Sequence, residues 1–318
     1  MTVSSCWNPT RPGRIPIVLV HGTASSPVRW AEMLNEFQSD PIIRARYQFW
    51  FFIYSTGNPV LYSASLLREA LRDTISELDP EGDDNALRRM VVIGHSQGGL
   101  LTKLQVISSE ARFWDNISDR SFEGLEIDPE TRETLGKALF FERQEFIERV
   151  IFISTPHRGS FLADSRLGSF ASRLVKTPTD LLGQAVDLAR AGVDLVESAV
   201  ERGRGFFDIF ARRDESAQLE RRLQRLPSSV DNMKSDHPFT ITLQAIPVDA
   251  HVHAHSIIPV LGGPPAEGQN DGVVEYSSAH INEAASEFIV YQSGHSAQSH
   301  PDTIQEARRI LLEHLDAR

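Results

Sequence analysis

The sequence predicts an α/β fold in which a mainly parallel sheet of about six strands is flanked by helices. Short apolar runs typical of buried strands alternate along the chain with segments whose apolar residues recur at helical spacing. The first run, 15–20 (IPIVLV), is continuously apolar, as a strand covered on both faces requires. No internal repeat or low-complexity tract interrupts this pattern.

Six strands and three helices follow from the apolar pattern. We expect strands at 15–20, 47–54, 90–93, 150–153, 239–246 and 287–291. One helix is expected over 64–78, which carries a single apolar stripe, and a second directly after the strand at 90–93. A last helix is expected from Pro301, because proline suits the first helical turn.

The segment 160–236 departs from the alternation, because no strand is apparent in it. Within it, 180–200 has the periodicity of a long amphipathic helix. We expect a single domain, 1–318, in which 160–236 is a helical cap inserted over the strand ends. A plain packing layer is the alternative.

Composition and charge exclude several classes of protein. With 41% hydrophobic and 24% charged residues, the chain is typical of neither disordered nor fibrous proteins. Its net charge of -11 argues against non-specific binding to nucleic acid or anionic membranes, which favour a basic surface.

The sequence leaves the cellular location open. The single cysteine, Cys6, cannot form an intrachain disulfide. Residues 1–10 lack the apolar region of a signal peptide, and no apolar run approaches the ~20 residues of a membrane span. Both a cytoplasmic protein and an exported protein whose leader has been removed fit these observations. Nothing in the sequence indicates the oligomeric state.

The strongest motif is Gly94-His95-Ser96-Gln97-Gly98, which fits the pattern G-x-S-x-G. It stands between an expected strand and an expected helix, which is the setting of a nucleophile elbow. This tight turn strains the serine, and small neighbours relieve the crowding. The hydroxyl of Ser96 is then presented at the carboxyl edge of the sheet, at a helix N-terminus that favours developing negative charge. Ser96 is therefore the candidate nucleophile, with an ordinary glycine-rich turn as the alternative.

A serine hydroxyl is a weak nucleophile until a base takes its proton, and in this kind of fold the chain order is serine, acid, histidine. Asp271 lies in the turn 270–274 after the expected fifth strand, and His295 follows the sixth. Both would stand at the same sheet edge as Ser96. We therefore expect Asp271 to be the acid and His295 the base.

Other residues compete for these roles. Asp249 is the alternative acid, although it follows Pro247 as a turn residue would. His300 is the alternative base, but it precedes Pro301 and would serve as a helix cap. His280 is expected to be structural. His157 precedes the acid in the chain, so we expect it to lie near the floor of the pocket rather than to act as the base.

Acyl transfer also needs donors for the oxyanion. One should be the backbone N–H of Gln97, which follows the nucleophile. The other should be the N–H of Thr23, in the loop after the first strand, where Gly22 allows a close backbone approach.

The series Asp249-x-His251-x-His253-x-His255 is the one candidate for a metal site. On a strand, all four side chains would share one face. The spacings typical of zinc sites are absent, however, so we expect neither a metal nor another cofactor.

These motifs together resemble bacterial lipases and esterases of the α/β-hydrolase superfamily. The resemblance rests on LVHGT (19–23), VIGHSQGG (92–99), STPHRGS (154–160), NDGVV (270–274) and SGHS (293–296), and is closest to triacylglycerol-lipase-like and PGAP1-like members with a short HG-x oxyanion loop. It covers nearly the whole chain, weakly over 160–225. It implies an α/β-hydrolase fold, with Ser96, Asp271 and His295 as the triad and Thr23 and Gln97 as oxyanion donors. The HGGG motif of another esterase branch is absent, and Gln97 stands where many relatives carry methionine.

We therefore expect a serine carboxylic-ester hydrolase, an esterase or lipase that forms an acyl-enzyme. Phe161, Leu162 and the aliphatic segment 180–200 favour medium or long acyl chains. A small-molecule or lipid ester is the expected substrate, with transient contact between the cap and a lipid interface. Polyesterase, thioesterase and lipid deacylase share this machinery. A non-catalytic binding protein of the same fold is less favoured, because every triad and oxyanion position is chemically competent.

Overall fold

Seven strands form one sheet in the structure, a computed structural model that describes residues 3–4, 10–164, 229–264, 266 and 268–316. They are β1 (Val3–Ser4), β2 (Ile15–Val20), β3 (Tyr47–Phe52), β4 (Met90–His95), β5 (Ile147–Ile153), β6 (His253–Val260) and β7 (Ser286–Tyr291). Their order is β1-β3-β2-β4-β5-β6-β7. All neighbouring pairs are parallel except β1 with β3. The predicted, mainly parallel sheet of about six strands is confirmed, and the two-residue β1 adds an antiparallel edge.

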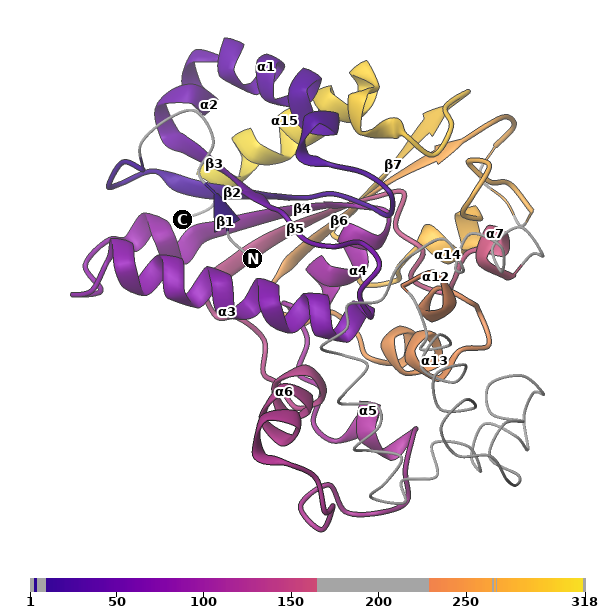
Figure 1. The fold of residues 1–318 in the computed structure, drawn as a ribbon. Helices are drawn as coiled ribbons and strands as arrows, with labels where there is room; N and C mark the ends of the chain where they lie inside the picture. Colours follow the sequence, from indigo (N-terminus) through magenta and orange to yellow (C-terminus); the bar gives the residue numbers. More distant parts are fainter. Residues whose placement is uncertain (1–2, 5–9, 165–228, 265, 267, 317–318) are drawn as a thin grey trace.

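Helices cover both faces of this sheet (Figure 1). One layer contains α1 (Ala31–Ser39), α2 (Pro41–Arg46) and α15 (Pro301–Asp316), and the other contains α3 (Val60–Leu78), α4 (Gln97–Lys103), α5 (Arg112–Asp115), α6 (Pro129–Leu139) and α13 (Pro238–Ala245). The short elements are α7 (Phe161–Asp164), α12 (Ser229–Asn232), α14 (Tyr276–Ala279), η1 (Pro27–Trp30), η2 (Asn85–Arg89) and η3 (Ala297–Ser299).

Two apolar cores, one on each side of the sheet, hold the layers together. Along β2, Ile17 and Leu19 belong to the core under α1 and α15, whereas Val18 and Val20 belong to the core under α3 and α4. Because successive side chains of a strand point to opposite faces, both sets must be apolar. This is why the strand reads as a continuous apolar run.

The expected strand at 239–246 is wrong, because this segment forms the helix α13. Pro238 occupies its first turn, and the ring nitrogen Nδ1 of His237 accepts a hydrogen bond from the N–H of Phe239 at 3.1 Å. Phe239 and Leu243, four residues apart, are both buried, as on one face of a helix. The proline and the histidine cap at the helix start, together with tertiary packing, therefore outweigh the β propensity of this short segment.

The strand in this part of the chain is β6, which the sequence did not predict. It lies between β5 and β7 and is buried from Ala254 to Val260. Three of its residues, His255, Ser256 and Pro259, interrupt the apolar run by which a buried strand is recognised in a sequence. Because β6 precedes Asp271, this residue still follows a parallel strand of the sheet.

Only the ends of the expected cap at 160–236 fall within the described residues. There, α7 and α12 are helical, while the amphipathic segment 180–200 lies outside the described residues. Among the described residues, none of the helices combines the length and the hydrophobicity that a membrane span requires.

A group of charged and imidazole side chains, centred on the buried Arg149, joins β5, β6 and α15. Arg149 lies 3.0 Å from Glu313 and donates to Nε2 of His255 at 2.6 Å and to Nδ1 of His314 at 3.3 Å. The second nitrogen of His255 contacts the hydroxyl of Ser286, and that of His314 contacts a backbone carbonyl. Burial lowers the pKa of both histidines to about 4, so both are neutral near pH 7.

Candidate active site

The turn between β4 and α4 places Ser96 at the carboxyl edge of the sheet. Its backbone is strained, with φ 54° and ψ -125°, and its N–H donates to the carbonyl of Ile153 at 2.9 Å. A Cβ at position 98 would lie 2.2 Å from the carbonyl oxygen of Val20, so only glycine lets the turn pack against β2 at Gly98. The turn has the strand–turn–helix geometry of a nucleophile elbow.

The structure brings Ser96, Asp271 and His295 together from three separate strand ends. Nε2 of His295 lies 2.9 Å from Oγ of Ser96, and Nδ1 lies 2.7 Å from Oδ2 of Asp271. With the proton of a neutral imidazole on Nδ1, this nitrogen donates to the carboxylate and Nε2 accepts from the hydroxyl. The arrangement can therefore move a proton from Ser96 to His295.

The carboxylate of Asp271 is fixed by its own turn. It is buried, and Oδ1 accepts hydrogen bonds from the N–H groups of Val273 at 2.9 Å and Val274 at 2.7 Å. These bonds leave Oδ2 directed at the imidazole of His295. The motif NDGVV thus supplies both the acid and the donors that orient it.

The loop after β2 lies directly against the elbow. A Cβ at Gly22 would be 2.8 Å from Cβ of Ser96, which only a residue without a side chain allows. The hydroxyl of Thr23 donates to the side-chain oxygen of Gln97 at 2.6 Å and so ties the loop to the start of α4. Because Gln97 is the first residue of α4, its N–H has no acceptor within the helix.

The competing acid and base are occupied elsewhere. Asp249 Oδ1 lies 2.9 Å from the ring of His251, and its Oδ2 pairs with Arg143. His300 accepts a hydrogen bond from the N–H of Asp302 through Nδ1, at the start of α15, as a helix cap does. Among the contacts of the described residues, neither Asp249 nor His300 is hydrogen-bonded to Ser96, Asp271 or His295.

Two further histidines have different surroundings. His280 lies 2.5 Å from a carboxylate oxygen of Glu287. His157 is buried against the ring of Phe152, and in the described part of the chain neither of its nitrogens has a hydrogen-bond partner. Burial lowers the pKa of His157 well below its ordinary value, so its ring is neutral at pH 7.

The residues of the candidate metal site do not share one strand face. Strand β6 begins at His253, and Asp249 and His251 precede it as a contacting pair. His255 is bound by Arg149 and Ser286. Within the part of the chain that the structure describes, no group of three or more histidine, cysteine or acidic side chains is placed to hold a metal ion.

Two contacts to His295 were not anticipated from the sequence. Its backbone carbonyl lies 2.8 Å from Nε2 of His95 and accepts a hydrogen bond from the hydroxyl of Ser154 at 3.1 Å. Both residues belong to motifs visible in the sequence, GHSQG and STPHRGS, but a bond to a backbone oxygen far along the chain leaves no pattern of its own.

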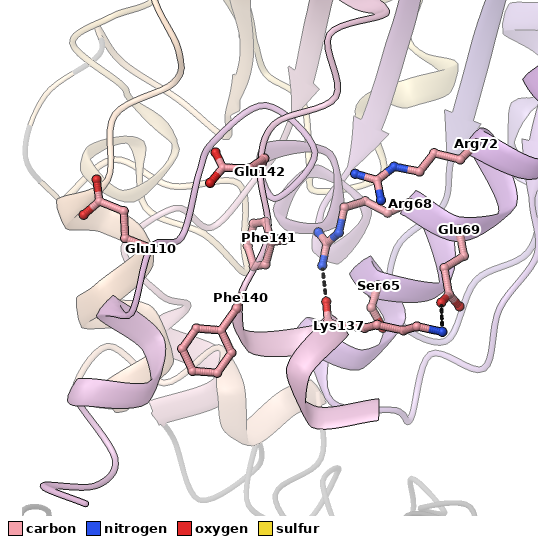
Figure 2. Close-up of a pocket in the computed structure, with 9 residues that line it drawn as sticks. All are labelled: Ser65, Arg68, Glu69, Arg72, Glu110, Lys137, Phe140, Phe141 and Glu142. Atoms are coloured by element: carbon pink, nitrogen blue, oxygen red, sulfur yellow. Dashed lines mark hydrogen bonds and ion pairs between the residues drawn. The ribbon is translucent and has the colours of Figure 1, made fainter. Parts of the chain in front are cut away.

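A pocket of about 410 Å³ lies elsewhere, between α3, α6 and the loop after α6 (Figure 2). Its lining is Ser65, Arg68, Glu69, Arg72, Glu110, Lys137, Phe140, Phe141 and Glu142. The guanidinium of Arg68 donates to the carbonyls of Leu104 and Lys137 and lies over the ring of Phe141. The guanidinium thus binds backbone carbonyls at the C-terminal ends of α4 and α6, where the helix dipole favours a cation. No residue of the elbow or the triad lines this pocket.

A model of the alpha/beta hydrolase family matches residues 17–307. Lipase BlEst2 of Bacillus licheniformis in its mature form is 16% identical, with a TM-score of 0.51, over 95% of this chain and 93% of that one. Lipase 1 from Pelosinus fermentans is 14% identical, with a TM-score of 0.52, over 97% and 100% of the two chains. No functionally curated protein matches the sequence. At these identities the likeness to the two lipases is one of fold.

Proposed function

The chain belongs to the alpha/beta hydrolase family, and from this premise we propose that it is a serine hydrolase of carboxylic esters. The observation that carries the proposal is the hydrogen-bonded series from Asp271 through His295 to Ser96, at 2.7 and 2.9 Å. A strained serine at a strand–turn–helix junction, with an imidazole in reach and a buried carboxylate behind it, is what acyl transfer requires.

The reaction has two steps. His295 takes the proton of the Ser96 hydroxyl as Oγ bonds to the ester carbonyl carbon, and the carbonyl oxygen becomes an anion near the N–H groups of Thr23 and Gln97. The tetrahedral intermediate then expels the alcohol, which receives the proton from His295. Water attacks the acyl-enzyme in the same way and releases the carboxylic acid and free Ser96. Throughout, Asp271 holds the imidazole and stabilises its charged form.

Labelling with a fluorophosphonate tests the nucleophile. We expect the wild-type protein to be labelled, because an activated serine oxygen displaces fluoride from phosphorus. Ser96→Ala should not be labelled, whereas Ser277→Ala, at an exposed serine, should react like the wild type. Gel fluorescence and intact-protein mass spectrometry measure both outcomes. An unlabelled wild type would favour a non-catalytic binding protein, and labelled Ser96→Ala would place the nucleophile elsewhere.

We further propose that the acyl group is of medium or long chain length. Phe161 is 38% exposed at the start of α7. The preceding residue, Ser160, donates a hydrogen bond to the carbonyl of Val273 at 2.6 Å, in the turn that carries Asp271. A partly exposed apolar residue therefore directly follows a residue bound to the turn that carries Asp271. The two similar structures are both described as lipases, which supports an acyl-ester substrate.

Rates on p-nitrophenyl esters test the acyl preference. We expect kcat/KM to rise at least about tenfold from acetate to octanoate, because each added methylene that leaves water contributes favourably. Phe161→Ser should reduce this rise while leaving the rate on acetate nearly unchanged. A maximum at acetate in the wild type would contradict the preference without contradicting ester hydrolysis.

A further inference from the structure

The backbone carbonyl of His295 is held by two donors from neighbouring strand ends. His95 ends β4 and Ser154 follows β5, and their side chains reach this oxygen at 2.8 and 3.1 Å. The same two strand ends are joined directly, because the N–H of Ser96 donates to the carbonyl of Ile153 at 2.9 Å. The loop that carries the base is therefore fastened to the two segments that surround the nucleophile.

His95 is suited to be a permanent donor. It is buried, and burial lowers its pKa to about 3, so its ring is neutral across the pH range of ester hydrolysis. A neutral ring that contacts a carbonyl through Nε2 must carry its proton there. Its other nitrogen, Nδ1, is buried and has no hydrogen-bond partner among the residues that the structure describes. Among the described residues, the side chain of His95 thus makes its hydrogen bond to His295.

Ser154 holds an unfavourable backbone conformation to reach the same oxygen. Its φ is 53°, in the left-handed region that residues other than glycine avoid, and its N–H donates to the carbonyl of Ile257 at 3.1 Å. Glycine would fit this backbone without strain. A serine is therefore present where conformation alone favours glycine, and its hydroxyl contacts the carbonyl of the candidate base.

We propose that His95 and Ser154 are positioning residues that fix the imidazole of His295 relative to Ser96 by binding its backbone carbonyl. This inference rests on the proposed ester hydrolysis. An imidazole must lie within hydrogen-bond reach of the nucleophile to take its proton, and a misplacement of 1 Å can lower a rate about 100-fold. Because His95 and Ser96 are adjacent, one peptide segment carries both the nucleophile and a donor that holds its base.

Ser154→Gly separates positioning from stability. The change removes the hydroxyl but relieves the positive φ, so we expect a melting temperature close to that of the wild type. We also expect kcat on a p-nitrophenyl ester to fall about tenfold, with KM nearly unchanged, because the base is misplaced rather than the substrate. Glu110→Gly is the matched control, since Glu110 has a φ of 50° and lies at the pocket of Figure 2, away from the triad. Its kcat should equal that of the wild type.

His95 variants test the other donor. His95→Phe keeps a ring but has no N–H, and should lower kcat about tenfold. His95→Gln can place an amide N–H near the former position of Nε2, and should recover most of the lost kcat. The double variant H95F/S154G should lose about 100-fold, because the carbonyl then has neither donor. Circular dichroism and thermal melting establish that each variant is folded.

The outcomes distinguish this inference from the proposed function. Variants with wild-type kcat, a change confined to KM, or His95→Gln as slow as His95→Phe would overturn the positioning role while leaving ester hydrolysis intact. A wild type that neither hydrolyses esters nor reacts with fluorophosphonate would overturn the proposed function, and the positioning role with it.

Discussion

Replacing His295 with alanine is expected to lower kcat on p-nitrophenyl esters by about 10⁴-fold or more, the loss typical of removing a member of a serine triad. The reason is geometric, since Nε2 of His295 is 2.9 Å from Oγ of Ser96. His300→Ala is the matched control, because this histidine caps α15 instead. Its kcat should stay within about twofold of the wild type, as is usual for substitutions away from a site.

The acid can be assigned with a second matched pair. Asp271→Asn should lower kcat by about 10⁴-fold, because the amide favours the wrong imidazole tautomer, whereas Asp249→Asn should not. Steady-state kinetics with each folded variant provide the measurement. If His300→Ala or Asp249→Asn were the inactive member of its pair, the proposed triad would be incorrect.

The folded state is expected to lose stability as the pH falls from about 6.5 toward 4. The pKa of His255 and of His314 is lowered from 6.5 to about 4 in the fold, so the unfolded chain binds more protons in this interval. Stability contributed by their neutral forms is complete above pH 6.5 and is lost as the pH falls toward 4. At pH 5 the expected loss is about 2 kcal/mol for each histidine, a large share of the stability of a typical domain.

Urea unfolding at pH 7.5, 6 and 5 measures this dependence. His255→Gln should weaken it, because glutamine does not titrate. His253→Gln, at an exposed position two residues earlier on β6, should keep most of the wild-type dependence, because the charge of His253 is only a minor cause of the two lowered pKa values. A free energy of unfolding that is unchanged between pH 7.5 and 5 would contradict the assignment to the buried histidines.

Topology explains how much of the fold and of the candidate site could be predicted. Parallel strands all end at one edge, so residues that directly follow strands must lie near one another. Ser96 follows β4 and His295 follows β7, and both strands were expected from their apolar runs. Asp271 was placed by its turn, by chain order and by the NDGVV motif of the resemblance, although the strand before it was expected at 239–246 and lies instead at His253–Val260.

The error at α13 and the missed contacts have a common physical origin. A short apolar segment such as 239–246 fits a strand or a helix, and its neighbours in space decide which one forms. The bonds from His95 and Ser154 to His295 depend likewise on a backbone oxygen that lies about 200 and 140 residues away in the chain. Such information is present only in the assembled sheet.

Arg149 stands near the start of β5, whereas Ser154 and the nucleophile lie beyond the strand ends. The span between them is about 15 Å at the rise of a strand. The loss of stability that His255 and His314 are expected to cause at low pH therefore arises away from the proposed catalytic residues. Replacing the histidines around Arg149 should therefore reduce the loss of folding stability at low pH while leaving the residues of the proposed triad in place.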